Sequence, residues 1–189
     1  MGLTLITAPG SEPVTFEEAK AYLKITGSAM DEQIRSFIRS VRRAGERASG
    51  RAFMTQTWDY FIDFFPASVI QLPRPPLASV TYVKYVATDG TLTTLASTDY
   101  QVSTSREPGT IEPSWDAGSW PADVRAVTDA VVIRFVAGYG DTPEEVPEDI
   151  RSAILKGCLL EETGQGGGTN LVAELFTDFW HGCHDILDL

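Results

Sequence analysis

The chain has 189 residues, of which 43% are hydrophobic and 22% are charged. This composition is typical of a folded soluble protein and argues against wholesale disorder, and the length favours one domain or a domain with a large insertion. No apolar run approaches the roughly 18 residues that a membrane-spanning helix needs, and the N-terminal residues do not resemble a signal peptide. We therefore expect a cytoplasmic product whose two cysteines are thiols.

The distribution of charge is more informative than the formal net charge of -11. Residues 141–189 hold eleven Asp and Glu against Arg151 and Lys156, so this segment carries most of the negative charge. A strongly acidic chain argues against free, sequence-independent DNA binding, because neutralising phosphates requires a positive excess. An acidic protein partner is the better match for any basic surface on this chain.

Two helices are predicted in the first third of the chain. Thr15 and Glu18 have the spacing of a capping box, which predicts a short helix that ends by Gly27. Apolar residues then recur at helical spacing from Ile34 to Ala48, and Gly50 suits the left-handed conformation found just past helix C-termini. We expect the two helices to form an antiparallel pair, and the segment before the long helix to pack on it.

The long helix is rich in arginine and contains little acidic charge after its first turn. One interpretation is an ordinary solvated helix face. The sharper interpretation is a basic surface for an acidic partner, which could be a neighbouring copy, another protein or nucleic acid. The residues proposed to bind the partner are Arg35, Arg39, Arg42, Arg43 and Arg47.

Strand and turn signals dominate the middle of the chain. Strands are predicted at residues 57–65, 69–72, 79–86, 91–95, 100–103 and 131–137, with a hairpin signal at Asp89-Gly90. The proline-rich residues 72–77 predict a rigid connector or an edge. Residues 106–123 predict a long loop, and its Trp115 and Trp120 are candidates for a contact surface.

A third helix is predicted after Pro147, which suits the first position of a helix. The residues predicted to form its core face are Ile150, Ile154, Leu155, Cys158 and Leu159. A glycine joint follows at residues 164–168. Beyond it, a short amphipathic helix is predicted that either packs on its own domain or docks into a partner. Its apolar residues are Leu171, Leu175, Phe176, Phe179 and Trp180.

The sequence contains no convincing catalytic or cofactor site. The glycines at 164–168 are not followed by the Lys and Ser or Thr of a phosphate loop, and no serine lies in a nucleophile-elbow motif. His181, Cys183 and His184, with Cys158 upstream, match no standard zinc spacing. We therefore predict neither an enzyme nor a bound cofactor or metal.

Several motifs together carry a resemblance to a known family. They are residues 12–15 (EPVT) with 18–20 (EAK), 50–52 (GRA), 56–58 (QTW), 72–77 (LPRPPL) with 79–80 (SV), and 138–141 (GYGD) before 146–147 (VP). In this order they resemble the head–tail connector, or adaptor, proteins of tailed bacteriophages and of phage-derived gene transfer agents. The resemblance covers roughly residues 3 to 160, and the tail after Gly164 departs from the pattern.

The resemblance implies a structural protein that forms a ring between the portal of a DNA-filled head and the neck or tail. The implied partners are further copies of itself, the portal protein and the next neck, stopper or tail protein, with DNA only as cargo in the channel and no membrane. The implied location is the head–tail junction of a virion or phage-like particle, reached from the bacterial cytoplasm. The tail helix would then fold on docking to the portal.

Other functions remain open from the sequence. They are a stopper or tail-completion protein, a nucleic-acid-binding module that uses the arginine helix, and a carbohydrate-binding module that uses the two loop tryptophans. The predicted fold class is α+β. Its parts are a helical core of residues 1–53 and 141–163, an antiparallel β insertion of residues 54–140, and a joint and flexible tail of residues 164–189.

Overall fold

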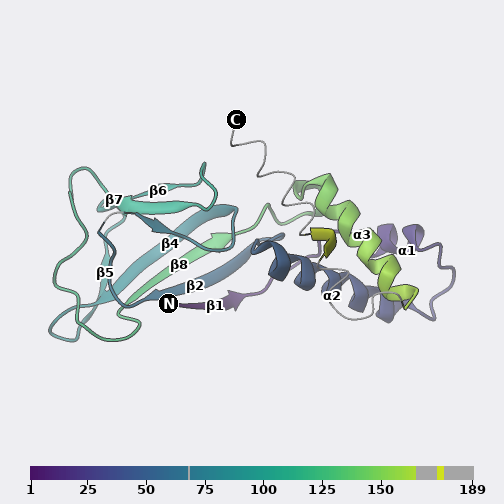
Figure 1. Cartoon of the computed structure of the whole chain (residues 1–189), viewed down its shortest axis with the longest axis horizontal. Helices are drawn as coiled ribbons and strands as arrows, with labels where there is room; N and C mark the ends of the chain where they lie inside the picture. The colour runs from purple at the N-terminus through teal and green to yellow at the C-terminus, as the bar shows by residue number, and fades with distance from the viewer. Residues whose placement is uncertain (68, 165–173, 177–189) are drawn as a thin grey trace. The chain divides into compact units, whose positions relative to one another are not determined.

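The computed structural model describes residues 1–67, 69–164 and 174–176. Helices and two antiparallel sheets confirm the predicted α+β class (Figure 1). The chain divides into two compact units: a β unit of Met1–Ala8 and Thr55–Gly138, and a helical unit of Pro9–Met54 and Tyr139–Leu189. No described helix has the length and apolar character needed to cross a membrane.

The helical unit is built from helices α1 (Phe16–Tyr22), α2 (Asp31–Ser49) and α3 (Glu148–Glu162), with a 3-10 turn η1 (Pro143–Glu145). Thr15 and Glu18 form the predicted capping box, which satisfies backbone N–H groups that a helix start leaves unpaired. Gly50 ends α2 with φ of 68°, in the left-handed conformation that glycine adopts without steric cost. Local sequence signals therefore set the start of α1 and the end of α2.

Helix α3 packs along α2, and α1 contacts both (Figure 1). The close approach of α2 and α3 depends on Gly157, because a Cβ built there would lie 2.5 Å from Cγ1 of Val41. Ile150, Ile154 and Cys158 of α3 are buried as predicted, whereas the prediction for Leu159 is wrong, since it is 40% exposed. The buried residues of this core include Val14, Ile34, Ile38, Val41, Phe53, Met54 and Val146.

The β unit contains a five-stranded sheet in the order β1-β2-β8-β4-β5, in which all neighbours are antiparallel. Its strands are β1 (Gly2–Thr7), β2 (Gln56–Ile62), β8 (Val131–Ala137), β4 (Leu77–Val86) and β5 (Leu92–Leu95). The alternation of buried and half-buried residues along β8 shows that one face of this central strand lies in the core.

A smaller sheet has the order β3-β7-β6, from Ile70–Gln71, Thr110–Pro113 and Tyr100–Ser103. The largest fully buried side chains of the β unit come from both sheets and from the segment after β3, and they are Leu72, Val83, Ile111, Val131, Ile133 and Phe135. Residues 72–76 of the predicted connector lie between β3 and β4, with Arg74 at φ of 62°, whereas Leu77 begins β4. The prolines at 73, 75 and 76 cannot donate to a strand ladder, which explains why residues 72–76 stay outside the sheets.

Two strands depart from the sequence predictions. The segment before the long helix was predicted to lie in the helical core of residues 1–53, but Gly2–Thr7 pair with β2 as strand β1. Residues 106–123 were predicted as one loop, but Thr110–Pro113 form β7 between β3 and β6. Both strands are formed by partners distant in sequence, and short-range patterns carry little information about such pairing.

Candidate functional site

Four of the five arginines proposed to bind a partner lie on the exposed side of α2. Arg35, Arg39, Arg43 and Arg47 are all exposed, and their spacing of four residues places each next to the following one on the helix surface. We call these four residues the α2 basic face. Within the described part of the chain, Arg39, Arg43 and Arg47 form no ion pair, so their charges are directed to solvent.

One end of the α2 basic face borders a groove of about 280 Å³. The guanidinium of Arg35 lies 4.2 Å from the centre of the Phe16 ring, a cation–π contact that holds the arginine beside the start of α1. Arg35 also lies 3.9 Å from Glu32, in an exposed pair that is weak by geometry. The groove is lined by Ser11, Glu12, Val14, Thr15, Phe16, Arg35, Ile38, Arg39 and Pro143. The groove brings two guanidinium groups next to an aromatic ring. This combination suits a peptide surface that presents carboxylates, alone or together with apolar side chains.

Arg42 does not belong to this exposed face, which corrects the sequence prediction. Its side chain is 6% exposed and binds Glu12 through Nε at 2.6 Å and Glu46 through Nη1 at 2.8 Å. Burial opposes the charged form, but the Glu12 hydrogen bond and the two carboxylate charges together raise the pKa of Arg42. Glu46 also accepts the backbone N–H of Phe53 at 3.1 Å. Arg42 therefore ties the segment before α1 and the exit of α2 to the middle of the helix.

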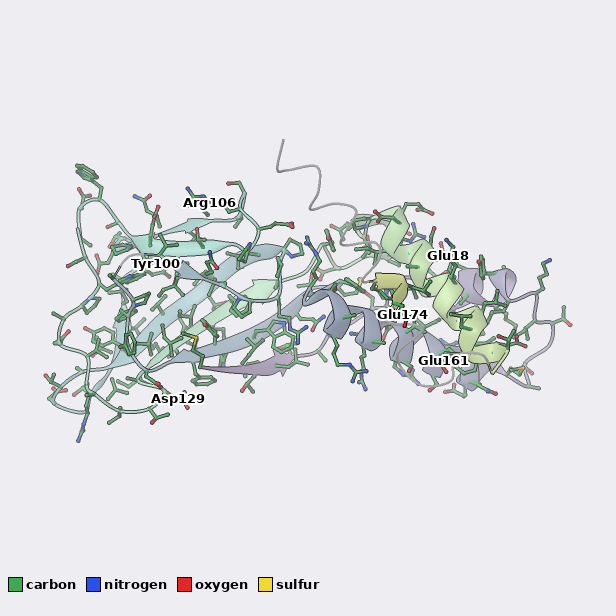
Figure 2. The ribbon with its side chains drawn as sticks, in the orientation of Figure 1. Glu18, Tyr100, Arg106, Asp129, Glu161 and Glu174 are labelled. Atoms are coloured by element: carbon green, nitrogen blue, oxygen red, sulfur yellow. The ribbon has the colours of Figure 1, made fainter. Side chains whose placement is uncertain are left out.

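A second charged network connects α1 to α3. Glu18, labelled in Figure 2, accepts the N–H of Thr15 at 2.8 Å and also binds Arg151 of α3. The backbone hydrogen bond from Thr15 lowers the pKa of Glu18, burial opposes this shift, and the Thr15 hydroxyl and Arg151 add to it. One carboxylate thus caps α1 and anchors α3. These bonds hold α1 and α3 together within the helical unit that carries the α2 basic face.

The two loop tryptophans have different environments. Trp115 is 92% exposed and remains a candidate for contact with a partner. Trp120 is 7% exposed and stacks on Phe65, with ring centres 4.8 Å apart and planes 6° from parallel. The predicted contact role of Trp120 is therefore corrected to a packing role within the β unit, because a stacked and buried ring presents little surface to a partner.

Only part of the predicted tail helix falls within the described residues. Glu174, Leu175 and Phe176 are helical, and Phe176 is 3% exposed. Its ring lies 5.6 Å from that of Phe53 and covers Gly45, where a Cβ would clash with it at 2.8 Å. Phe176 thus packs on its own helical unit. Leu171, Phe179 and Trp180 lie outside the described residues.

No group of three His, Cys, Asp or Glu side chains in the described ranges is arranged to hold a metal ion. His181, Cys183 and His184 lie outside the described residues. Cys158 is buried in the helical core, and burial, with a smaller contribution from Glu161, raises the pKa of its thiol to about 12. It is therefore a protonated core residue and a poor nucleophile.

Sequence reasoning missed Glu12 as the partner of Arg42 and Phe16 as the support of Arg35. The Arg42–Glu46 spacing of four residues was a usable signal that Arg42 differs from its neighbours, because such pairs face one another on a helix. Glu12 lies 30 residues from Arg42, and no local pattern connects them.

Solved structures with a similar fold come from gene transfer agent (GTA) particles. The chain matches a chain in the neck of an empty GTA particle computed with C6 symmetry, with a TM-score of 0.72 and 20% identity. It also matches chains of the native gene transfer agent virion (TM-score 0.68, 19% identity) and of the native GTA neck computed with C12 symmetry (0.65, 21%). Each match covers 86% of this chain and 84% of the other. No protein-family model and no curated protein sequence matches the chain. At these identities the likeness shows a shared fold.

Proposed function

We propose that this chain is a non-enzymatic structural protein of the neck of a phage-like particle, where it forms a ring adaptor between the portal and the next neck or tail component and extends the DNA channel. The observation that carries the proposal is the fold likeness over 86% of the chain to a chain of a GTA particle neck. Because that likeness includes both the helices and the sheets, it is more specific than a shared helical pair would be.

The charge arrangement of the helical unit supports assembly into a ring. A cyclic ring needs a heterologous interface, in which two different surfaces of the same chain meet. The α2 basic face is one candidate surface. The second is an exposed acidic cluster that runs from η1 into the first turn of α3, made of Glu144, Glu145, Glu148 and Asp149. Single exposed ion pairs contribute little, so binding would depend on several of them acting together.

The first experiment measures the native mass of the purified protein, alone and mixed with the portal protein of the same particle. We expect a ring of defined stoichiometry on the portal. The variant Arg39→Glu/Arg43→Glu should weaken the ring, because it reverses two charges of the α2 basic face.

The matched control is Arg106→Glu/Arg125→Glu, which changes the net charge equally with exposed arginines of the β unit (Arg106 is labelled in Figure 2). Equal loss in both variants would show a general effect of charge and contradict the assigned role of the α2 basic face. A protein that ignores the portal but binds a tail component would be a stopper or tail-completion protein. Salt-sensitive binding to duplex DNA with no ring would instead indicate a nucleic-acid module.

A further inference from the structure

The five-stranded sheet has two free edges, strands β1 and β5. Each is paired on one side only among the described residues: β1 with β2, and β5 with β4. A free edge presents unpaired N–H and C=O groups along its length and can accept another strand. Soluble proteins commonly block such edges with charged residues or proline.

Strand β1 has neither form of protection. Gly2–Thr7 contains no charged residue and no proline, and its last four residues are exposed. Leu5 and Ile6 are 42% and 43% exposed, which is unusual for large apolar residues on an edge. The register shift between Leu5 and Thr7 leaves a regular stretch from Gly2 to Leu5. This part of the edge is uncharged, regular in register and open to pairing.

Strand β5 has a similar character and length. Leu92–Leu95 spans four residues without charge or proline, and Leu92 is 60% exposed. Four residues of β5 therefore match the regular stretch of β1. The chemistry of the two edges is compatible, because neither introduces a charge that pairing would have to desolvate.

The sheet order determines how two copies could join through these edges. Neighbouring strands alternate in direction across β1-β2-β8-β4-β5, so β1 and β5 run the same way. A rotation that brings a second copy beside the first can therefore place its β5 parallel to β1 of the first, and this contact uses two different edges of the chain. It repeats head to tail, which is the requirement of a closed ring.

We propose that β1 of one copy pairs in parallel with β5 of the next copy, so that the five-stranded sheets continue from subunit to subunit. This inference rests on the ring of the proposed function and adds the contact that closes it. A parallel pair of four residues forms few hydrogen bonds, so one such contact is weak alone and becomes effective when a closed ring or the portal aligns many copies.

The register of the sheet predicts which side chains come together. Thr4 opposes Asp59, and Asp59 opposes Arg134 of β8. Thr94 opposes Lys84, two residues from Tyr82, which itself opposes Arg134. Thr4 and Thr94 consequently project from the same face of the sheet, as does Leu92, whereas Leu5 projects from the other face.

Disulfide trapping tests this contact directly. Thr4→Cys is combined with Thr94→Cys, and separately with Leu92→Cys, in a Cys183→Ser background that keeps the buried Cys158. Within one chain β1 and β5 are separated by three strands, or roughly 19 Å, so the pair can form a disulfide only between copies. We expect mild oxidation of the assembled protein to give a ladder of linked subunits for at least one pair. The control Leu5→Cys/Thr94→Cys should give none, because its side chains lie on opposite faces.

Charge exchange provides a second test that needs no oxidation. Thr4→Lys/Thr94→Lys places like charges at the contact and should raise the concentration needed for assembly at least tenfold. Thr4→Lys/Thr94→Glu differs by one residue and should return that concentration to within about threefold of the unmodified protein, because opposite charges pair across strands.

The outcomes separate this inference from the proposed function. A ring on the portal without a ladder and without rescue overturns edge pairing and leaves the neck role intact. A ladder in a protein that never binds portal supports edge pairing and contradicts the adaptor role on the portal. Absence of both ring and ladder, with and without portal, contradicts both.

Discussion

The helical unit and the β unit present different chemistry to their surroundings. The helical unit exposes charge: the α2 basic face on one helix and an acidic cluster at the start of another. The β unit exposes uncharged backbone along β1 and β5. Salt screens contacts between exposed charges but leaves backbone hydrogen bonds largely unaffected. Added salt should therefore weaken the proposed contact of the α2 basic face and spare the proposed pairing of β1 with β5.

The largest expected effects come from removing a buried side chain in either unit. Phe135 of β8 and Ile154 of α3 are both 0% exposed. Phe135→Ala should cost about 3–5 kcal/mol and Ile154→Ala about 2–5 kcal/mol, because each leaves a cavity. In a Trp180→Phe background the remaining tryptophans all belong to the β unit. Urea unfolding followed by tryptophan fluorescence then reports the β unit, and circular dichroism at 222 nm reports mainly the helices. We expect Phe135→Ala to shift mainly the fluorescence transition and Ile154→Ala mainly the helical one. Coincident shifts of both signals would show that the units unfold together.

How far the sequence predicted this structure depends on how local the determining contacts are. The start of α1 follows from Thr15 and Glu18 and the end of α2 from Gly50, and the structure confirms both. The segment that forms strand β1 was predicted to pack on the long helix, because its partner β2 lies some fifty residues further on. Strand β7 lies in a segment rich in glycine and proline, and this composition led to the prediction of a loop. Non-local pairing is what short-range patterns fail to report.

The candidate site was predicted only in outline for the same reason. The exposure of Arg35, Arg39, Arg43 and Arg47 agrees with a basic helix face. Arg42 differs from them because it binds Glu46 and the distant Glu12, and only the spacing to Glu46 is visible in the local sequence. The sequence also could not distinguish Trp115 from Trp120, since the burial of Trp120 depends on stacking with the distant Phe65. Whether the exposed arginines bind a partner stays a prediction.

The next largest effect distinguishes two arginines of the same helix. Arg42→Ala removes a buried cation together with its ion pairs to Glu12 and Glu46, so we expect a loss of about 3–5 kcal/mol. Arg39→Ala, three residues away and exposed, should change the free energy of unfolding by less than about 0.5 kcal/mol. Urea denaturation followed at 222 nm measures both. Similar small losses in both variants would show that the ion pairs of Arg42 contribute little to the free energy of unfolding. Arg42 would then be no more important for stability than the exposed arginines of α2.

A smaller effect is expected where α2 and α3 approach one another. A helix is normally about 1 kcal/mol more stable with alanine than with glycine at an interior position. Gly157→Ala, however, places a Cβ against the stiff side chain of Val41. We expect the clash to dominate, with a net loss of about 1–3 kcal/mol. The double variant Val41→Ala/Gly157→Ala should lose less stability than the sum of the two single variants, because the smaller side chain at 41 opens space for the new methyl group. A stabilising Gly157→Ala would show that the helices can separate at little cost.

The smallest effect concerns acid and the capping carboxylate of α1. The pKa of Glu18 is lowered in the folded chain, mainly by the Thr15 N–H, so its charge stabilises the fold fully above the ordinary pKa of about 4.3. That stabilisation disappears as the pH falls through the folded pKa, because the protonated carboxyl binds the helix start more weakly. Glu18 is 39% exposed, so Glu18→Gln should cost only about 0.5–1 kcal/mol at pH 7.

The measurement is the free energy of unfolding of both proteins at pH 7 and at successive values down to pH 3. The two curves should converge on acidification, since protonated Glu18 and glutamine carry the same charge. Glu17→Gln, an exposed substitution in the same turn, should give a smaller difference at pH 7 because no hydrogen bond ties Glu17 to the Thr15 cap. A Glu18→Gln difference that persists to pH 3 would assign the effect to the shape of the side chain.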